Sequence, residues 1–191
     1  MLDPHQLLAR LDALGIAHRT VEHPPVFTVE EAKALRGDLP GHHIKNLFLR
    51  NRKEEMWLVV ALEDRPVDLK RLGEVLGAGR LSFGSPERLR RHLGVEPGSV
   101  TPFALVNDET RVVRLALDRG LADGGPVNAH PLVNTMTTAI VLADLLRQAS
   151  VEERRRVAVR LAPLAELPDS LARLLLRDEP SVAAPLIEQC A

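Results

Sequence analysis

Apolar residues near the amino terminus recur at the spacing of an α-helix, which indicates that one face of this helix is buried. The apolar stripe consists of four leucines, Leu7, Leu8, Leu11 and Leu14. Asp3 is a favourable N-cap, Pro4 suits the first helical position, and Gln6 can complete a capping box. Gly15 is placed to end the helix, so a first helix that packs against a core is predicted.

Alternation of apolar and polar residues predicts strands in the next part of the chain. A short strand is expected over residues 18–23, and a second capped helix over 28–35 follows two prolines. Residues 44–50 and 56–63 resemble the two strands of a hairpin, because the polar stretch between them is typical of a turn. The second of these strands is apolar on both faces, so the hairpin should lie inside a sheet.

Capping signals and short strands continue through the middle of the chain. Asp68 is expected to cap one helix, and a short strand precedes another helix over 86–93. Residues 104–118 are predicted to form a second hairpin, 120–134 to be mostly loop, and 137–149 to begin as a strand and end as a helix. This mixture of helices and hairpins is typical of an α+β fold with a mixed, largely antiparallel sheet.

The last segment, residues 151–191, has a helix-only pattern that differs from the rest of the chain. Pro168 and Pro180 divide it into two or three short helices. Such helices bury an apolar face only against neighbours, so the segment should pack on the main domain or on a partner. The expected organisation is therefore one domain over 1–150 and an all-helical tail over 151–191.

The composition of the 191 residues matters mainly for what it excludes. Hydrophobic residues make up 45%, enough for an ordinary core, but aromatic residues make up only 3%. A base-stacking platform for single-stranded nucleic acid is therefore not expected. The net charge of −1 means that a nucleic acid would have to meet a local basic patch.

The single cysteine, Cys190, excludes a disulfide or a cysteine-based zinc site within one chain. The sequence contains no HExxH motif, no Walker loop and no GxGxxG motif, so neither metal nor cofactor is expected. The amino terminus lacks the apolar region of a signal peptide, and no apolar run approaches the length of a membrane span. A soluble cytoplasmic protein is the resulting expectation.

Lys45 stands at the head of the first hairpin strand, where it shares a face with Leu47 and Leu49. A lysine among buried leucines is costly unless something pairs with it. Two interpretations stay open at this point. The side chain can lie on apolar surface with its ammonium in water, or the ammonium can stand at the mouth of a pocket and hold an anion or polarise a carbonyl.

Two loops carry further candidate residues. One holds Asn128, His130 and Asn134 between prolines, which suits a rigid site, although a turn that satisfies its own backbone is an equal alternative. The other holds Gly98 and Ser99, whose backbone N–H groups in a tight turn could cradle a carbonyl oxygen. Gly-Ser turns are common, so this second signal is weak alone.

Basic residues are numerous, and most are expected to be solvated. The best placed for a phosphate backbone are those of the predicted turn near Lys45, namely Arg50, Arg52 and Lys53.

Five segments together resemble a known family. They are "EHPPVFTVEEA", "GHHIKNLFLR", "GRLSFGSPERL", "LGVEPGSVTPFALVND" and "PVNAHPLVNTMTTAI". In this order they are similar to the bacterial YbaK/ProX-type aminoacyl-tRNA deacylases, relatives of the editing domain of bacterial prolyl-tRNA synthetase. The similarity runs from about residue 3 to about residue 148 and is greatest to the branch that hydrolyses alanyl-tRNA(Pro).

The resemblance implies an α+β fold with a mixed sheet around a small pocket, and metal-free hydrolysis of an aminoacyl ester. The family's lysine falls on Lys45 and the adjacent asparagine on Asn46, which would fix the terminal ribose-phosphate end. Its glycine-serine turn falls on Gly98 and Ser99, which would cradle the ester carbonyl. Its histidine-proline loop falls on His130, which would shape the pocket. The implied partners are the aminoacylated acceptor end of tRNA and, as a further partner, prolyl-tRNA synthetase.

A small pocket would also explain why such an enzyme is needed. A synthetase that admits proline cannot fully reject the smaller alanine, because one methylene separates ligands by only ~1–3 kcal/mol. Thr20, Val26 and Phe27 are the expected lining of the pocket, with core packing as the alternative.

Some readings remain open. Removal of cysteine or another small aminoacyl group is a near alternative, and a non-catalytic tRNA-binding module or a scaffold belongs to a different class. Relatives usually close with a strand of the "GHEP-x-I-V-D" kind, which is absent here, and the tail 151–191 stands in its place. The "EERRR" stretch of this tail could touch tRNA, but a solvated helix face is the simpler reading.

Overall fold

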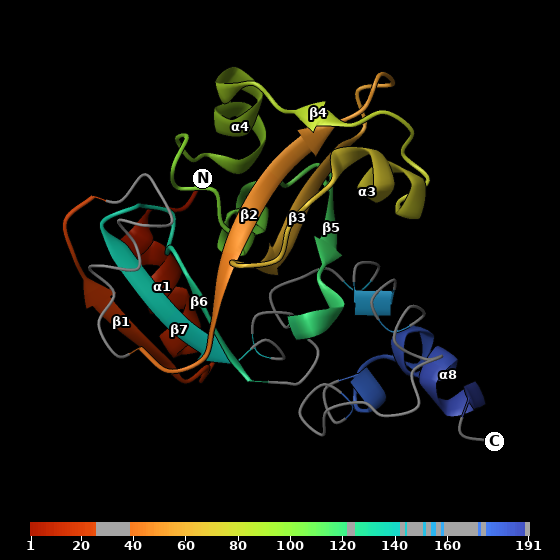
Figure 1. Cartoon of the computed structure of the whole chain (residues 1–191). Coiled ribbons are helices and arrows are strands. Elements are labelled where there is room, and N and C mark those ends of the chain that lie inside the picture. Colours follow the sequence, from red (N-terminus) through yellow and green to blue (C-terminus); the bar gives the residue numbers. More distant parts are fainter. Residues whose placement is uncertain are drawn as a thin grey trace.

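The computed structural model describes residues 1–25, 39–121 and 125–141, and near the carboxyl terminus 144, 151, 154–155, 158, 172 and 175–189, with 186–189 in backbone only (Figure 1). The described strands form one seven-stranded sheet in the order β1-β7-β6-β2-β3-β5, with β4 also paired to β2. The strands are β1 (His18–Glu22), β2 (His42–Arg50), β3 (Met56–Leu62), β4 (Ser82–Phe83), β5 (Val113–Leu117), β6 (Pro126–Ala129) and β7 (Met136–Val141).

The described helices begin where the capping residues predict. They are α1 (Pro4–Ala13), α3 (Leu69–Val75), α4 (Pro86–Leu93) and α8 (Pro180–Gln189), with 3₁₀ helices η1 (Pro102–Asn107) and η2 (Arg119–Leu121). The Asp3 carboxylate accepts from the Gln6 N–H at 2.8 Å, and the Gln6 side chain accepts from the Asp3 N–H at 3.0 Å. The side chains of Asp68 and Ser85 accept from backbone N–H groups in the first turns of α3 and α4 and so cap these helices, without a reciprocal contact. The predicted first helix, including its capping box, is therefore confirmed.

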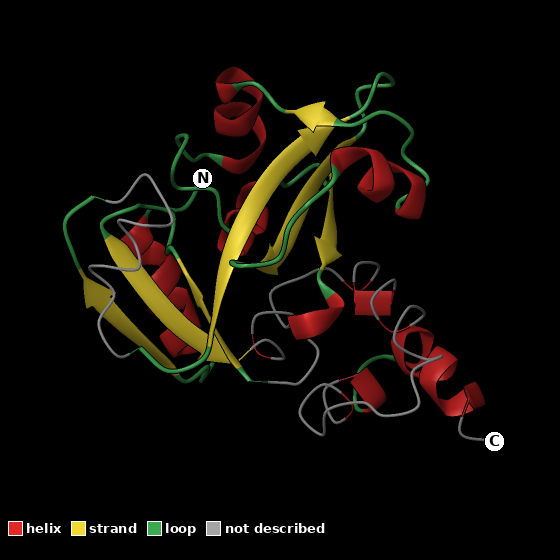
Figure 2. Ribbon diagram, in the orientation of Figure 1, coloured by secondary structure: helices red, strands yellow, loops and turns green. Residues whose placement is uncertain are grey.

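The predicted α+β class is also confirmed. Antiparallel pairs join β1 to β7, β2 to β3, β2 to β4 and β6 to β7, whereas β2–β6 and β3–β5 are parallel. The long strand β2 connects the half of the sheet that lies beside α1 to the half that lies beside α3 (Figure 2). On one edge β2 pairs with β6 only at His42 and His43 and with β4 only at Leu49 and Arg50. No described strand pairs with the middle of that edge.

One sequence prediction is wrong, and another missed a short strand. Residues 104–118 are not a hairpin, because residues 102–107 form η1 and β5 pairs in parallel with β3. Pro102 lacks the N–H that a ladder needs and suits the first turn of a helix, which Thr101 caps. The segment 120–134, predicted to be mostly loop, also contains the short strand β6, whose Val127 is fully buried between β2 and β7.

The sheet has two apolar faces. The larger core lies on the α1 face and includes Leu7, Leu11, Phe48, Val60, Val127 and Ile140. The smaller core lies on the α3 face and includes Leu49, Trp57, Val59, Ala78 and Leu81. Leu14, which the pattern placed in the buried stripe, is exposed, because α1 ends at Ala13.

The carboxyl-terminal tail is helical at most of the positions described, except at residues 177–179 directly before α8. Pro180 is the first residue of α8, which agrees with a boundary there. Arg154 and Asp178 form a bidentate ion pair, with Nε–Oδ2 and Nη2–Oδ1 distances of 2.5 and 2.9 Å. The expected helix over 28–35 and the break at Pro168 lie outside the described residues. No described helix combines the length and the apolar character that crossing a membrane requires.

Candidate functional site

The ammonium of Lys45 is held by backbone carbonyls at the end of the neighbouring strand. Its Nζ donates to the carbonyl oxygen of Glu63 at 2.9 Å and also to that of Arg65. Lys45 lies on the face of β2 that carries Leu47 and Leu49, as the pattern predicts. Two carbonyls therefore offset the cost of turning this lysine inward. An ammonium has three N–H donors, which leaves one for a ligand.

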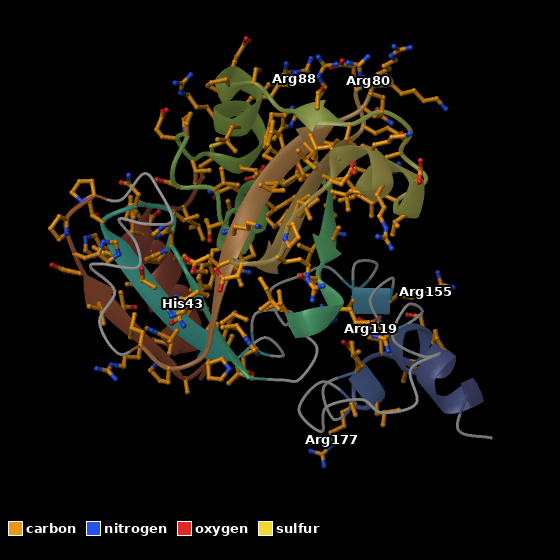
Figure 3. The ribbon with its side chains drawn as sticks, viewed as in Figure 1. His43, Arg80, Arg88, Arg119, Arg155 and Arg177 are labelled. Carbon is orange, nitrogen blue, oxygen red and sulfur yellow. The ribbon has the colours of Figure 1, made fainter. Side chains whose placement is uncertain are left out.

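A short parallel pairing gathers polar side chains on the face of Lys45. His43 lies opposite Asn128 in the β2–β6 register, so their side chains share a face. Lys45 stands two residues further along β2 and shares this face. His130 follows directly after β6 and lies beside His23, whose Nε2 contacts Thr137 on the same face of β7. Figure 3 labels His43 at the lower end of β2, beside β7. Four polar residues from two distant segments thus lie on one face of the sheet, around the β2–β6 pairing.

Asn128 is the most deeply buried member of this polar face, with 4% of its surface exposed. Its Nδ2 donates to the carbonyl oxygens of Pro40 and His42 at 3.1 and 3.4 Å. Its Oδ1 has no partner among the described residues. A buried amide oxygen without a donor is costly, so this atom is suited to accept a hydrogen bond from a ligand.

His130 presents a neutral imidazole to the same face. Its Nδ1 lies 2.8 Å from the carbonyl oxygen of Met136, so this nitrogen carries the proton and Nε2 holds a lone pair. Burial lowers the pKa of His130, and the nearby His23 lowers it further, although the Met136 carbonyl acts in the opposite direction. The His130 Nε2 is therefore suited to accept a proton or a hydrogen bond near neutral pH.

His23 is a neighbour that sequence reasoning missed. Its ring centroid lies 6.0 Å from that of His130. Its Nδ1 is 2.8 Å from the Pro24 carbonyl oxygen and its Nε2 is 2.9 Å from the Thr137 hydroxyl. The signal available was its position at the end of the alternating stretch 18–23, directly before two prolines.

The glycine-serine turn lies against the other face of β2. The Asn46 Nδ2 donates to the Val100 carbonyl oxygen at 2.9 Å, while the Asn46 Oδ1 has no described partner. The Ser99 N–H donates to the Glu96 carbonyl oxygen at 2.9 Å, which closes the turn around Gly98, whose φ is 91°. The Ser99 N–H is therefore already used. Of the two predicted cradle donors, only the Gly98 N–H has no acceptor among the described residues.

Thr20 is separated from Lys45 by the sheet. Its hydroxyl lies 2.9 Å from that of Thr138, and this pair faces the core on the α1 side. The alternative reading of Thr20 as a packing residue therefore describes its surroundings better. Val26 and Phe27, the other predicted lining residues, lie outside the described part of the chain.

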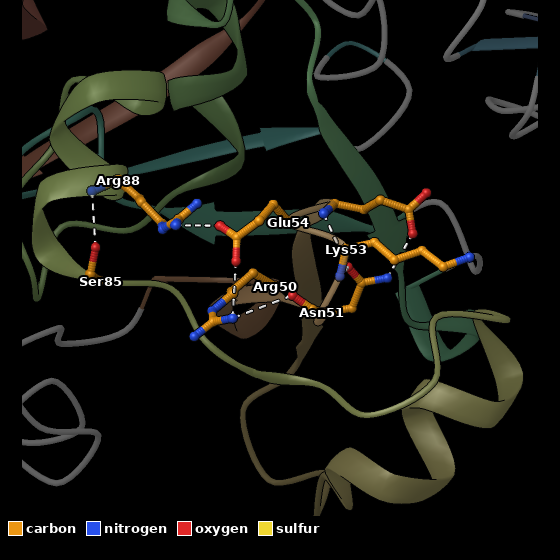
Figure 4. Close-up of polar contacts among 7 residues, drawn as sticks. Arg50, Asn51, Lys53, Glu54, Ser85 and Arg88 are labelled. Carbon is orange, nitrogen blue, oxygen red and sulfur yellow. Dashed lines mark hydrogen bonds and ion pairs between the residues drawn. The ribbon is translucent and has the colours of Figure 1, made fainter.

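The predicted tRNA-contact turn is organised by its own polar groups. Asn51 Oδ1 accepts from the backbone N–H groups of Lys53 and Glu55 at 2.9 and 3.0 Å. Arg50 pairs with Glu54 at 3.1 Å, and Arg88 from α4 pairs with the same carboxylate (Figure 4). Glu54 thus offsets part of the positive charge that the sequence places here.

Proximity in sequence overstated how near this turn lies to Lys45. Arg50 stands five residues further along β2, which is roughly 17 Å in an extended strand. Arg52 and Lys53 are exposed at that far end. A contact between tRNA and these three residues would be made away from the polar face at the β2–β6 junction.

The arrangement suits ester hydrolysis by positioning. On the face of Lys45 the structure places an ammonium N–H near the end of β3, an imidazole nitrogen with a lone pair just after β6, and on β6 an amide oxygen that lacks a donor among the described residues. Such groups can orient a hydroxyl, a water molecule or an ester. Within the residues that the structure describes, no three His, Cys, Asp or Glu gather in a way that could hold a metal ion.

Comparison with known proteins places the chain among editing proteins. Residues 23–148 match the family model of the aminoacyl-tRNA editing domain. The chain is 39% identical to the prolyl-tRNA editing protein ProX of Acetoanaerobium sticklandii, over 73% of this chain and 85% of that protein. It is 41% identical to prolyl-tRNA synthetase associated domain-containing protein 1 of Danio rerio, over 80% of this chain and 83% of that protein.

A solved structure shares the fold. The crystal structure of a proposed trans-editing enzyme for prolyl tRNA synthetase superposes with a TM-score of 0.59 at 24% identity. The superposition covers 78% of this chain and 93% of the other. At this identity the likeness concerns the mixed sheet and its flanking helices.

Proposed function

This chain belongs to the aminoacyl-tRNA editing domain family, and we propose that it removes alanine from mischarged alanyl-tRNA(Pro). It is an aminoacyl-tRNA deacylase, an enzyme that hydrolyses the ester between an amino acid and tRNA, and it edits mischarged tRNA(Pro) in trans. Residues 1–150 form the editing unit in this proposal, and 151–191 form a helical tail. Prolyl-tRNA synthetase is proposed as a further partner, since the related proteins carry its name.

The proposed mechanism rests on Lys45 and His130 lying on the same face of the sheet. An aminoacyl ester is already activated, so the enzyme needs no protein nucleophile and can act by orienting water and the ester. The remaining N–H of Lys45 binds the terminal ribose or the ester oxygen. The neutral Nε2 of His130 accepts a hydrogen bond from the attacking water or from the 2′-OH of the substrate.

The open edge of β2 allows residues on both faces to reach one substrate. Asn46 and Gly98 lie on the face opposite Lys45, next to the stretch of β2 between its contacts with β6 and β4. A substrate end seated at this edge would meet Lys45 from one side and the Gly98 N–H from the other. Asn46, with its unpartnered Oδ1, would bind a hydroxyl of the terminal ribose.

The test is deacylation of alanyl-, cysteinyl- and prolyl-tRNA(Pro) by the wild type, by Lys45→Ala and by Lys70→Ala, an exposed lysine on α3. The proposal expects rapid release of alanine alone, loss of release in Lys45→Ala, and wild-type rates in Lys70→Ala. Faster release of cysteine than of alanine would replace the proposed substrate. Decay equal to that in buffer for every substrate would favour a tRNA-binding module without catalysis.

A further inference from the structure

Phe83 is an exposed aromatic residue at the edge of the sheet. It forms half of β4 and has 63% of its surface exposed, whereas Phe48 and Phe103 are buried. A single exposed apolar side chain needs no explanation by itself. Its fixed conformation and its surroundings are what set this residue apart.

The conformation of Phe83 is fixed from both sides. In the β2–β4 register Phe83 lies opposite Leu49, and the Gly84 N–H donates to the Phe48 carbonyl oxygen at 2.8 Å. The Phe48 ring occupies the space beside Gly84, where an added Cβ would lie 2.4 Å from the ring. Residue 84 therefore packs inward, and Phe83 is presented outward on a short, rigid strand. Little backbone entropy is lost when a residue held in this way binds a partner.

The surroundings of Phe83 are cationic. Figure 3 shows Arg80 and Arg88 at the end of the molecule where β4 lies. Arg80 is exposed and has no ion-pair partner among the described residues, while Arg88 pairs with Glu54. An aromatic ring at the same end of the molecule as these arginines is complementary to a nucleic-acid strand, whose bases stack on rings and whose phosphates attract guanidinium groups.

Phe83 also lies on the face that carries Lys45. Leu49 and Lys45 share a face of β2, and Phe83 is paired with Leu49, so Phe83 shares this face as well. Lys45 and Leu49 are four residues apart, roughly 13 Å along the strand. A single strand whose last ribose sits at Lys45 would therefore pass close to Phe83.

We propose that Phe83 is a stacking platform for an unpaired base of the tRNA 3′ end, upstream of the aminoacylated nucleotide. This inference rests on the proposed function for its substrate, but it assigns a separate subsite that binds rather than reacts. The low aromatic content argued against a platform, yet one rigid ring is enough to hold one base.

The test is equilibrium binding of uncharged tRNA(Pro) to Phe83→Ala, Phe83→Trp and the control Val75→Ala, which removes an equally exposed side chain from α3. Phe83→Ala is expected to weaken binding about 5- to 100-fold, and Phe83→Trp to restore it. Val75→Ala should bind as the wild type does. A tRNA(Pro) that lacks its unpaired 3′ nucleotides should bind wild type and Phe83→Ala equally.

The salt dependence of binding completes the test. Phe83→Ala should leave the slope of log affinity against log salt unchanged, whereas Arg80→Gln should reduce it by about one. Unchanged tRNA affinity in Phe83→Ala, or the same loss on the truncated tRNA, would overturn the subsite. So would unchanged tRNA affinity with weakened binding to prolyl-tRNA synthetase, because Phe83 would then contact protein. Binding is measured without hydrolysis, so failure of the catalytic proposal would remain distinguishable.

Discussion

The Nζ atom of Lys45 lies 2.9 Å from the carbonyl oxygen of Glu63. A side chain of β2 therefore binds the backbone just after the end of β3. Lys45, which we propose binds the substrate, therefore also stabilises the end of β3. Loss of activity on its removal can have either origin, and the two have to be separated.

Lys45→Met should lower the free energy of unfolding by about 1–3 kcal/mol, because two carbonyls lose a charged donor. Leu47→Met, on the same face, should cost less because it conserves volume. Urea denaturation measures both. Equal stability of Lys45→Met and wild type would show that the two hydrogen bonds contribute nothing net, and any loss of deacylation would then be catalytic.

His130 should remain neutral at pH values below the usual pKa of histidine, with its proton on Nδ1, because folding lowers its pKa. A pKa lowered by folding means that the unfolded chain takes up the proton first. Stability from this group is therefore full above about pH 6.5 and is lost as the pH falls through the folded pKa. Nitrogen-detected NMR of the imidazole reports the tautomer and the titration. A titration at or above that of free histidine would contradict the prediction.

Deacylation should fall over the same acidic range, since a protonated Nε2 no longer accepts a hydrogen bond. His130→Gln should abolish this acidic limb along with most of the rate, and an acidic limb that persists in the variant would belong to another group.

Gly84→Ala should destabilise the protein by about 1–3 kcal/mol, because the new methyl group would overlap the Phe48 ring. Ser82→Ala, exposed and on the strand that Gly84 follows, is the matched control and should have little effect. Thermal denaturation compares the two. The prediction fails if Gly84→Ala unfolds at the same temperature as Ser82→Ala.

Asp178→Asn should loosen the tail, because the Arg154 guanidinium would lose its bidentate partner. The hydrogen bond from Arg154 lowers the pKa of Asp178, so the stabilisation is present above the ordinary aspartate pKa and is lost as the pH falls. Limited proteolysis should cleave the variant faster after residue 150 at neutral pH. Glu179→Gln, next along the chain and exposed, should resist as the wild type does.

Elements that depend on local signals could be predicted from the sequence. The caps at Asp3, Asp68 and Ser85 and the hairpin of β2 and β3 follow from neighbours a few residues apart. The strand β6 could not, because its four residues lie between β7 and β2, and β2 is distant in sequence. Tertiary context decided this segment, and local propensity did not.

The candidate site divides in the same way. Lys45 and His130 were found from residue type and from resemblance, but their common face follows from the two-residue pairing of β2 with β6. The carbonyl partners of Lys45 and the use of the Ser99 N–H in its own turn depend on backbone geometry, which residue type does not reveal. His23 was missed because only folding brings it beside His130.

The pairing of β1 with β7 bears on how the chain folds during synthesis. Thr20 and Thr138, which share a hydrogen bond, are 118 residues apart. At ordinary translation rates their strands emerge from the ribosome about 6 to 24 s apart. For that interval β1 has no native partner, and its exposed backbone can pair with other chains. A nascent chain halted before β7 should therefore recruit chaperones.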